Sequence, residues 1–289
     1  MLRNSDRNTQ SIPSLLMSVN ANIDKLDETC LNISLLDAAP AEWNFYQPLG
    51  DDKMGELVDS IQSIGLMSPI VVWQRDNSRY MILSGHNRVH AFRIIYDKTQ
   101  NNQYLSVPAK IICDIDEDTA RQIIIDTNWV QRELSAIEKA KSIYEKYVSI
   151  AGNKIRAKKG DGRGPTVFDD IAKYYDIGNR MVQRYYRINF LAEPFQEMLK
   201  SGAIDLKSAE KLAGFEHETQ MWIYNAFPSQ LDNKTIAKLH NVMTKSEIEN
   251  VFLDAQKLKH HGMYLFKMYV PYEKKDSFEA YVKNYFVEK

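Results

Sequence analysis

The sequence has few cysteines, no long apolar run and no excess of charge of either sign. Its two cysteines, Cys30 and Cys113, are too few for a disulfide framework and lack the spacing of metal ligands. No apolar stretch approaches the roughly 18 residues that a membrane-spanning helix needs. Residues 1–19 also lack the continuous apolar segment of a signal peptide. We therefore expect a cytoplasmic protein without disulfide bonds, metal site or membrane contact.

The formal net charge is −1, from 37 Lys and Arg against 38 Asp and Glu. A sum near zero argues against a chain that binds nucleic acid over its whole surface, but the distribution of charge matters more than the sum. Residues 150–189 hold nine basic and four acidic residues, a local excess of +5. That excess is large enough to bind the phosphates of DNA, so one DNA-facing patch is expected on an otherwise acidic chain.

With 289 residues, the chain is long enough for about two domains of roughly 150 residues each. Its composition, 44% hydrophobic and 26% charged, is typical of globular proteins. Residues 151–165 hold four glycines and five Lys or Arg residues and are predicted to be an exposed linker. We therefore expect a flexible arm (1–30), a first domain (31–150), a second domain (151–230) and a C-terminal segment (231–289).

In the first domain, periodicity predicts alternating helices and strands. Apolar residues from Met54 to Ile64 recur at helical spacing, and Gly65 ends that helix. Further elements are predicted as strands at 69–74, 79–85 and 107–114 and helices at 86–96 and 117–129. The first two of these strands form a hairpin. Cys113 lies inside the third and is expected to be buried.

The rest of the chain reads as mostly helical. Ser135 with Glu138, and Thr166 with Asp169, have the spacing of capping boxes at helix starts. Helices are predicted at 167–175, 179–191, 193–201, 205–214, 217–226, 233–241 and 244–259, followed by a strand at 263–271 and a helix at 272–286. The whole order predicts an α+β fold: an α/β domain, an all-α domain and a small C-terminal α/β tail.

The first candidate site is the strand–turn–helix junction ILSGHNRVHAF. Gly85 permits a tight turn, after which the free N–H groups of the new helix form an anion site. His86, Asn87 and Arg88 follow in that turn, with His90 one turn further on. The alternative is that Arg88 pairs with a carboxylate and the histidines are surface residues. Asn128, Gln131 and Arg132 lie at a helix end and either form a second ligand-binding element or cap the helix.

The second candidate site is the helix pair at 167–191. Ala172, Ile177, Val182 and Tyr185 fit the anchor positions of a helix-turn-helix, although Asp176 stands where glycine is usual. The second helix exposes polar residues able to contact base edges, and the preceding linker adds basic residues for phosphates. The expected DNA-binding residues are Lys158, Lys159, Arg163, Asn179, Arg180, Gln183, Arg184 and Arg187. The alternative is a helical hairpin with a solvated face.

In order, these segments resemble the ParB family of chromosome and plasmid partition proteins. The resemblance covers roughly residues 31–215 and rests on LVDSIQSIGLMSPIVVW, SGHNRVHAF, VPAKII, DTNWVQRE and the helix-turn-helix. It implies an N-terminal ParB/sulfiredoxin-like domain that binds CTP with Mg²⁺, and a helix-turn-helix that reads a palindromic site in double-stranded DNA. It also implies a homodimer that closes into a DNA clamp, and a ParA-type ATPase as partner.

Within the family's Gly-Glu-Arg-Arg-x-Arg-Ala motif, Gly85, Arg88 and Ala91 match. His86, Asn87 and His90 replace the glutamate and two arginines, which removes two bidentate phosphate binders and implies at most a weak CTPase. In the Glu-Asn-x-Gln-Arg motif, Gln131 and Arg132 match, and Asn128 aligns with the asparagine if one residue is inserted. The departures make the chain most similar to ParB-like proteins of plasmids and mobile elements. No catalytic residue is predicted.

Two alternatives stay open. The chain could be a transcription or replication regulator of a mobile element that keeps the helix-turn-helix and has a degenerate nucleotide site. It could also be an enzyme on the sulfiredoxin-like fold, but His86 stands in the place of the reactive cysteine of sulfiredoxins and cannot do thiol chemistry. The first alternative differs from a nucleotide-gated partition protein only in its response to nucleotide.

Overall fold

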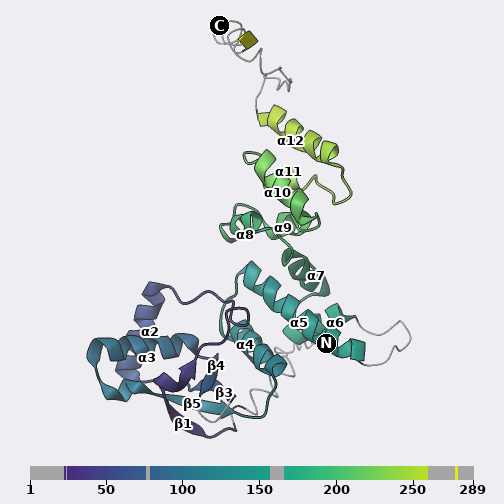
Figure 1. The fold of residues 1–289 in the computed structure, drawn as a ribbon. Helices are drawn as coiled ribbons and strands as arrows, with labels where there is room; N and C mark the ends of the chain where they lie inside the picture. The colour runs from purple at the N-terminus through teal and green to yellow at the C-terminus, as the bar shows by residue number, and fades with distance from the viewer. Residues whose placement is uncertain (1–22, 24, 76–78, 157–165, 260–276, 279–289) are drawn as a thin grey trace, which may run out of the picture.

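The computed structural model describes residue 23 and residues 25–75, 79–156, 166–259 and 277–278 (Figure 1). A curled sheet with its helices forms one end of the molecule, and a column of helices extends away from it. The predicted α+β order is confirmed. The strand expected at 263–271 and nearly all of the helix expected at 272–286 lie outside the described residues, as do Lys158, Lys159 and Arg163.

The sheet is mixed and has the strand order β1-β5-β3-β4-β2. β3 is antiparallel to β4 and parallel to β5, while β1 pairs antiparallel with β5 and β2 pairs parallel with β4. The strands are β1 (Glu28–Asn32), β2 (Leu36–Asp37), β3 (Ile70–Gln74), β4 (Tyr80–Ser84) and β5 (Ser106–Ile112). The predicted hairpin is therefore β3–β4.

Both faces of the sheet are covered, and the central strand β3 is apolar from Ile70 to Trp73. Ile70 and Val72 of β3 pack into one buried cluster, and the alternating Val71 and Trp73 pack into another. Helices α2 (Asp51–Ile64) and α3 (His86–Thr99) complete the first cluster, and α4 (Glu117–Gln131) completes the second. The short 3-10 helix η1 (Ile33–Leu35) connects β1 with β2, and η2 (Asn102–Leu105) connects α3 with β5.

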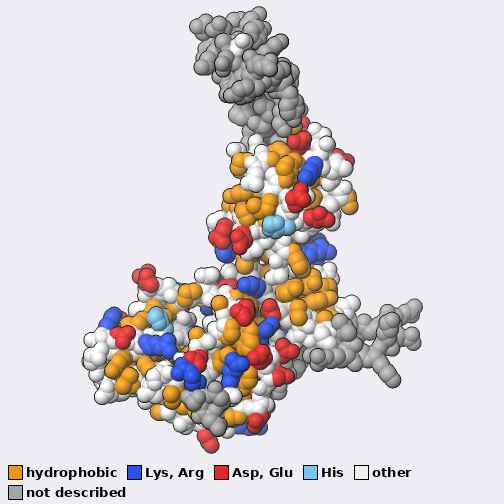
Figure 2. Space-filling view, in the orientation of Figure 1, with side chains coloured by type: hydrophobic (Ala, Val, Ile, Leu, Met, Phe, Trp, Pro, Cys, Tyr) orange, Lys and Arg blue, Asp and Glu red, His pale blue; other side chains and the backbone are white. Residues whose placement is uncertain are grey.

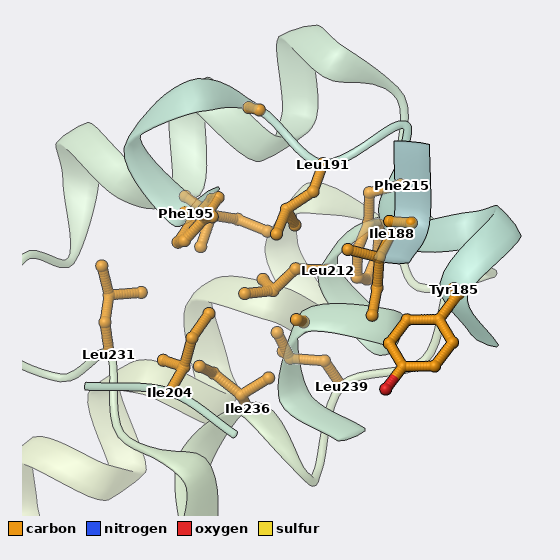
Figure 3. Close-up of a cluster of buried hydrophobic side chains, with 14 of the residues drawn as sticks. Tyr185, Ile188, Leu191, Phe195, Ile204, Leu212, Phe215, Leu231, Ile236 and Leu239 are labelled. Atoms are coloured by element: carbon orange, nitrogen blue, oxygen red, sulfur yellow. The ribbon is translucent and has the colours of Figure 1, made fainter. Parts of the chain in front are cut away.

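The helical column has its own buried core (Figure 3). Phe195, Leu212 and Ile236, from three different helices, meet at its centre. The helices are α5 (Ala136–Arg156), α6 (Val167–Tyr175), α7 (Asn179–Ile188), α8 (Glu193–Lys200), α9 (Leu206–Leu212), α10 (His217–Ala226), α11 (Asn233–Ile236) and α12 (Lys245–Lys259). Both predicted capping boxes are present, with Glu138 bonded to the Ser135 backbone and Asp169 to that of Thr166.

The structure departs from the sequence expectations at several places. α5 continues past residue 150, the expected domain limit, and its Ala140 and Ile143 pack in the helical core. β1 begins at Glu28, within the expected arm. The expected burial of Cys113 is wrong, because β5 ends at Ile112 and the thiol lies exposed beyond the sheet.

The helix expected at 233–241 is a single turn, α11. Beyond it, a side chain from α9 bonds to the backbone carbonyls that a longer helix would use. The Lys211 ammonium donates to the carbonyls of Ala237 and Leu239, at 2.6 and 2.9 Å, so these carbonyls need no helical partner. Leu239 then packs into the helical core. Among the described residues, no helix is both long and apolar enough to cross a membrane.

Candidate functional site

Gly85 makes the turn between β4 and α3 possible. Its φ of +100° lies in the left-handed region, and a Cβ atom there would stand 2.7 Å from Cγ2 of Ile70. No side chain caps α3, so the N–H groups of its first turn remain for another acceptor. The sequence thus places an open helix N-terminus, which favours anions, at the end of a buried strand.

This helix N-terminus opens into a pocket of about 790 Å³. All seven residues predicted to bind nucleotide line it: Gly85, His86, Asn87, Arg88, Asn128, Gln131 and Arg132. The two sequence motifs, on α3 and α4, therefore form one site. The volume lies within the roughly 300–1,000 Å³ typical of small-molecule sites.

The opposite wall of the pocket comes from residues that the sequence analysis missed. It is formed by the loop between β2 and α2 and by the start of α2, and includes Asn44, Tyr46, Gln47, Pro48, Leu49, Asp51, Lys53 and Met54. Pro48 and Gly50 indicate a loop in the sequence, but no local pattern brings that loop to α4. Its placement depends on contacts between distant segments.

These contacts centre on Glu138, which is buried at the start of α5. Its Oε1 accepts the Gln47 N–H at 2.9 Å and its Oε2 accepts the Ser135 N–H at 2.8 Å. Burial by itself raises the pKa of Glu138, but these bonds outweigh it and lower the pKa below its usual value. Arg132 donates to the Gln47 carbonyl at 2.9 Å and lies 3.4 Å from Glu138, so loop and α4 are tied together.

His86 lies largely inside the protein. Burial lowers its pKa to about 4, so the imidazole is neutral at pH 7 and adds no positive charge to the pocket. Its Nε2 lies 3.4 Å from the Ala39 N–H as acceptor. His90, in contrast, is exposed on the next turn of α3. The alternative that the histidines are surface residues therefore applies to His90 and not to His86.

Within the part of the chain that the structure describes, Arg88 bonds to the backbone and not to a carboxylate. Its Nη1 donates to the carbonyls of Ser68 and Pro69 at 2.9 and 2.7 Å, which fixes α3 against the start of β3. Burial lowers the pKa of Arg88, yet the guanidinium stays charged at pH 7 because its usual pKa is so high. Arg88 thus braces the pocket and also supplies it with a positive charge.

The pocket fits an anionic ligand such as a nucleotide better than it fits a metal ion alone. Three cations line it (Lys53, Arg88 and Arg132), together with the open N-terminus of α3. Its lining carboxylates are Asp51 and Glu133. The described residues contain no group of three or more His, Cys, Asp or Glu that would hold a metal. A Mg²⁺ ion here would depend on ligand phosphates and water for most of its coordination.

The helix-turn-helix is formed by α6 and α7. Asp176 adopts the left-handed conformation, with φ of 52° and ψ of 46°, at the position where glycine is usual. Aspartate tolerates this conformation better than most residues. The predicted anchors Ala172, Ile177, Val182 and Tyr185 all pack against the helical core.

The outer face of α7 carries the predicted DNA-binding residues in different environments. Arg180 and Arg187 are exposed, whereas Asn179 and Gln183 are half-buried. The Gln183 amide donates to the Asn179 side chain, which in turn donates to Asp169 of α6. Asp169 also closes the capping box, so the start of α6 orients the first residues of α7.

Arg184 points inward. Its side chain is 11% exposed, its Nε lies 2.6 Å from Glu210 of α9, and its Nη1 bonds to the sulfur of Met181. Arg187 reaches the other carboxylate oxygen of Glu210 at 3.1 Å but is 58% exposed. Glu210 lies beyond the 150–189 window, so counting charges within that window could not find it.

α4 connects the pocket with the helix-turn-helix. Thr127, Asn128 and Gln131 face the pocket. Asp126, which precedes them on the same helix, is buried and accepts hydrogen bonds from Tyr174 and Tyr175 of α6 at 2.6 and 3.1 Å.

A cation completes this buried connection. The Lys146 ammonium of α5 lies 3.3 Å from Asp126 and 3.7 Å from the centre of the Tyr174 ring. Trp129, one turn after Asp126 on the same helix, stacks on Tyr175 with ring centres 4.0 Å apart. Neighbouring residues of α4 therefore contact the pocket on one side of the helix and α6 on the other.

Comparison with known proteins gives this arrangement a family context. Residues 20–128 match the ParB N-terminal domain family. The chain is 24% identical over 249 residues to a probable chromosome-partitioning protein ParB of Campylobacter jejuni, covering 82% of this chain and 80% of that protein. It spans only 55% of the length of a ParB relative from Neisseria meningitidis.

Two solved structures are also similar, both of C-terminally truncated ParB from Caulobacter crescentus. One is complexed with CTP-γ-S, with 20% identity, 69% of this chain and 98% of that chain covered, and a TM-score of 0.30. The other is complexed to the centromeric parS site, with 17% identity, 78% and 99% coverage, and a TM-score of 0.42.

Proposed function

We propose that the chain is a ParB-like, sequence-specific DNA-binding protein of plasmid or chromosome partition whose hold on DNA is gated by CTP. The observation that carries this proposal is α4, which lines the pocket with Thr127, Asn128 and Gln131 and holds the helix-turn-helix through Asp126 and Trp129. A ligand that moves α4 would therefore act directly on α6.

DNA binding is supported by the helix-turn-helix geometry and by the exposed Arg180 and Arg187. The half-buried Asn179 and Gln183 lie beside them on α7, where residues at the start of a recognition helix reach base edges in the major groove. Lys158, Lys159 and Arg163 of the linker are proposed to contact phosphates, as their charge suits. Figure 2 shows acidic and basic side chains interspersed over the sheet-containing end. This mixture supports DNA binding at one local site and not over the whole surface.

CTP with Mg²⁺ is the ligand proposed for the pocket. The phosphates would lie at the N-terminus of α3 beside Gly85 and Arg88, within reach of the cations of the lining. Nothing in the lining provides a metal-bound nucleophile, and His86 is neutral where the family has glutamate. We therefore propose binding with weak or no hydrolysis.

A homodimer is proposed because palindromic sites are read by two-fold symmetric partners. The C-terminal segment 231–289 is proposed to contribute to it, although its described part packs Leu231, Ile236 and Phe252 into the helical core of the same chain. A ParA-type ATPase is the proposed protein partner.

The test begins with a site selected by the wild-type chain from a random pool of DNA duplexes. Calorimetry then measures CTP binding with Mg²⁺, with and without that duplex, with GTP as control. We expect heat with CTP that is absent with GTP, and loss of the selected site in Arg180→Ala. A selected site bound equally well by Arg180→Ala contradicts the assignment of α7.

The second candidate is a helix-turn-helix regulator with an inactive pocket. It is favoured by one observation: Arg88 and Arg132 already bond to backbone carbonyls, so both guanidiniums are partly used within the protein. In that case the selected duplex binds normally and calorimetry shows no heat with CTP.

A further inference from the structure

The recognition helix α7 is tied to α9 by one carboxylate. Glu210 holds Arg184 with one oxygen, at 2.6 Å from Nε, and Arg187 with the other, at 3.1 Å from Nη1. The carboxylate itself is 19% exposed. Three charges on two helices therefore form one compact unit beneath the outer face of α7.

Arg184 is the interior member of this unit. With 11% of its side chain exposed and with Nε and Nη1 both engaged, it is placed to support α7 against α9. To reach a base edge, it would have to leave Glu210 and expose a carboxylate that is mostly buried. That separation would leave the carboxylate with Arg187 as its remaining ion-pair partner and would break a largely buried pair, which costs free energy.

Arg187 is the outer member. More than half of its side chain is exposed, and only Nη1 bonds to Glu210. A guanidinium held at one nitrogen still presents further N–H donors to solvent, and a charged donor suits a phosphate oxygen. Its position at the last turn of α7 places it away from Asn179 and Arg180 at the first turn.

We infer that Glu210 is a positioning residue of the DNA-facing surface: it fixes Arg184 as an internal brace and aims Arg187 at the DNA backbone. Base readout then falls to Asn179, Arg180 and Gln183. This inference rests on the proposed DNA binding and reassigns Arg184, which the sequence pattern groups with the base-reading residues. The charge of Arg184 is matched inside the protein and contributes little to phosphate binding.

The test compares Arg184→Met, Glu210→Met and the double variant. Affinity is measured for the selected duplex and for a scrambled duplex of equal length, over a range of salt concentrations. We expect Arg184→Met to bind more weakly, because it removes the brace between α7 and α9 and leaves the Glu210 carboxylate with one cation fewer. The double variant removes both charges. It is expected to keep the ratio of selected to scrambled affinity within about threefold of wild type, because the effects of two contacting residues are coupled in a double-mutant cycle.

Two further variants supply the readouts that a purely structural role would not change. Arg187→Ala is expected to reduce the slope of log affinity against log salt by about 1 on both duplexes. Arg180→Ala is expected to lower the selected-to-scrambled ratio by about 5- to 150-fold, as for a lost bidentate base contact. If the double variant loses discrimination as Arg180→Ala does, Arg184 reads a base and the inference is overturned.

A failure of the proposed DNA binding gives a different result from a failure of this inference. If the wild-type chain selects no sequence, the proposed function fails, and the brace is then judged from thermal unfolding. A brace predicts that each single variant lowers the Tm and that the double variant recovers most of the loss. Additive losses in the double variant overturn the brace whether or not DNA is bound.

Discussion

At the scale of single residues, Gly85 has the least room for a side chain among the described glycines. Alanine there would carry a Cβ 2.7 Å from Ile70 Cγ2 in a backbone with φ of +100°. We expect Gly85→Ala to lower the free energy of unfolding by about 2–4 kcal/mol, from left-handed strain together with the clash. Chemical denaturation measures this.

A matched control is Gly55→Ala in the middle of α2, where nothing lies within 4 Å of the new Cβ. That change is expected to stabilise the protein by about 0.5–1 kcal/mol, because alanine is the better helix former. Equal effects of the two substitutions would show that the turn at Gly85 is not constrained as described.

His86 is expected to make stability depend on pH. Its pKa falls to about 4 in the folded protein, against about 6.5 when unfolded, so the unfolded chain binds more protons between these values. The contribution of His86 is therefore complete above pH 6.5 and declines as the pH falls toward 4. Between pH 7.5 and pH 5, wild type should lose about 1–2 kcal/mol more than His86→Gln.

Urea unfolding at the two pH values measures that difference, and His90→Gln, at the exposed histidine of the same helix, is the control. A pH dependence of His86→Gln that equals that of wild type would mean that His86 titrates normally. The sequence showed that a histidine follows Gly85 but not that its ring is buried, because burial depends on the distant Ala39 loop.

At the scale of elements, the connection of α4, α5 and α6 through Asp126 should be costly to break. Lys146→Met leaves the Asp126 carboxylate buried with tyrosine hydroxyls alone as partners. We expect a loss of about 3–5 kcal/mol in the free energy of unfolding, as for one partner removed from a buried pair. Arg75→Ala is the control, since its ion pair with Glu117 is about half exposed and should contribute under about 1 kcal/mol.

A loss from Lys146→Met as small as that from Arg75→Ala would mean that α6 is held by apolar packing alone. Burial lowers the pKa of Lys146, and the neighbouring Asp126 opposes that shift. Both effects on the Lys146 pKa depend on the packing of α4, α5 and α6 around the ammonium. This makes the cluster a contact between elements and not a property of one helix.

Elements were also the level at which sequence prediction worked best. The capping residues Ser135 and Thr166, the hairpin of β3 and β4 and the limits of α6 depend on neighbours within a few residues, and all were predictable. The loop at Asn44–Leu49, the Glu210 carboxylate and the Asp126 cluster depend on residues 20 or more positions away. Local periodicity carries no information on those contacts.

At the scale of the whole molecule, the sheet-containing end and the helical column share the helix α5. The motif residues on α3 and α4 were predicted from their types and converge on one pocket, which no single motif could show. α5 begins beside that pocket with Glu138 and continues into the helical core with Ala140 and Ile143. The boundary expected at residue 150 therefore falls inside a helix that serves both of these parts.

The stack of Trp129 on Tyr175 provides the chain with an internal optical reporter. In a variant with Trp43, Trp73 and Trp222 changed to Phe, the emission comes from the single indole between the pocket helix and α6. If CTP separates α4 from α6, the indole gains water contact, and its emission maximum should shift to longer wavelength. An unshifted spectrum at saturating CTP would mean that nucleotide leaves this junction closed, and the spectrum of the same variant unfolded in urea gives the reference for a solvated indole.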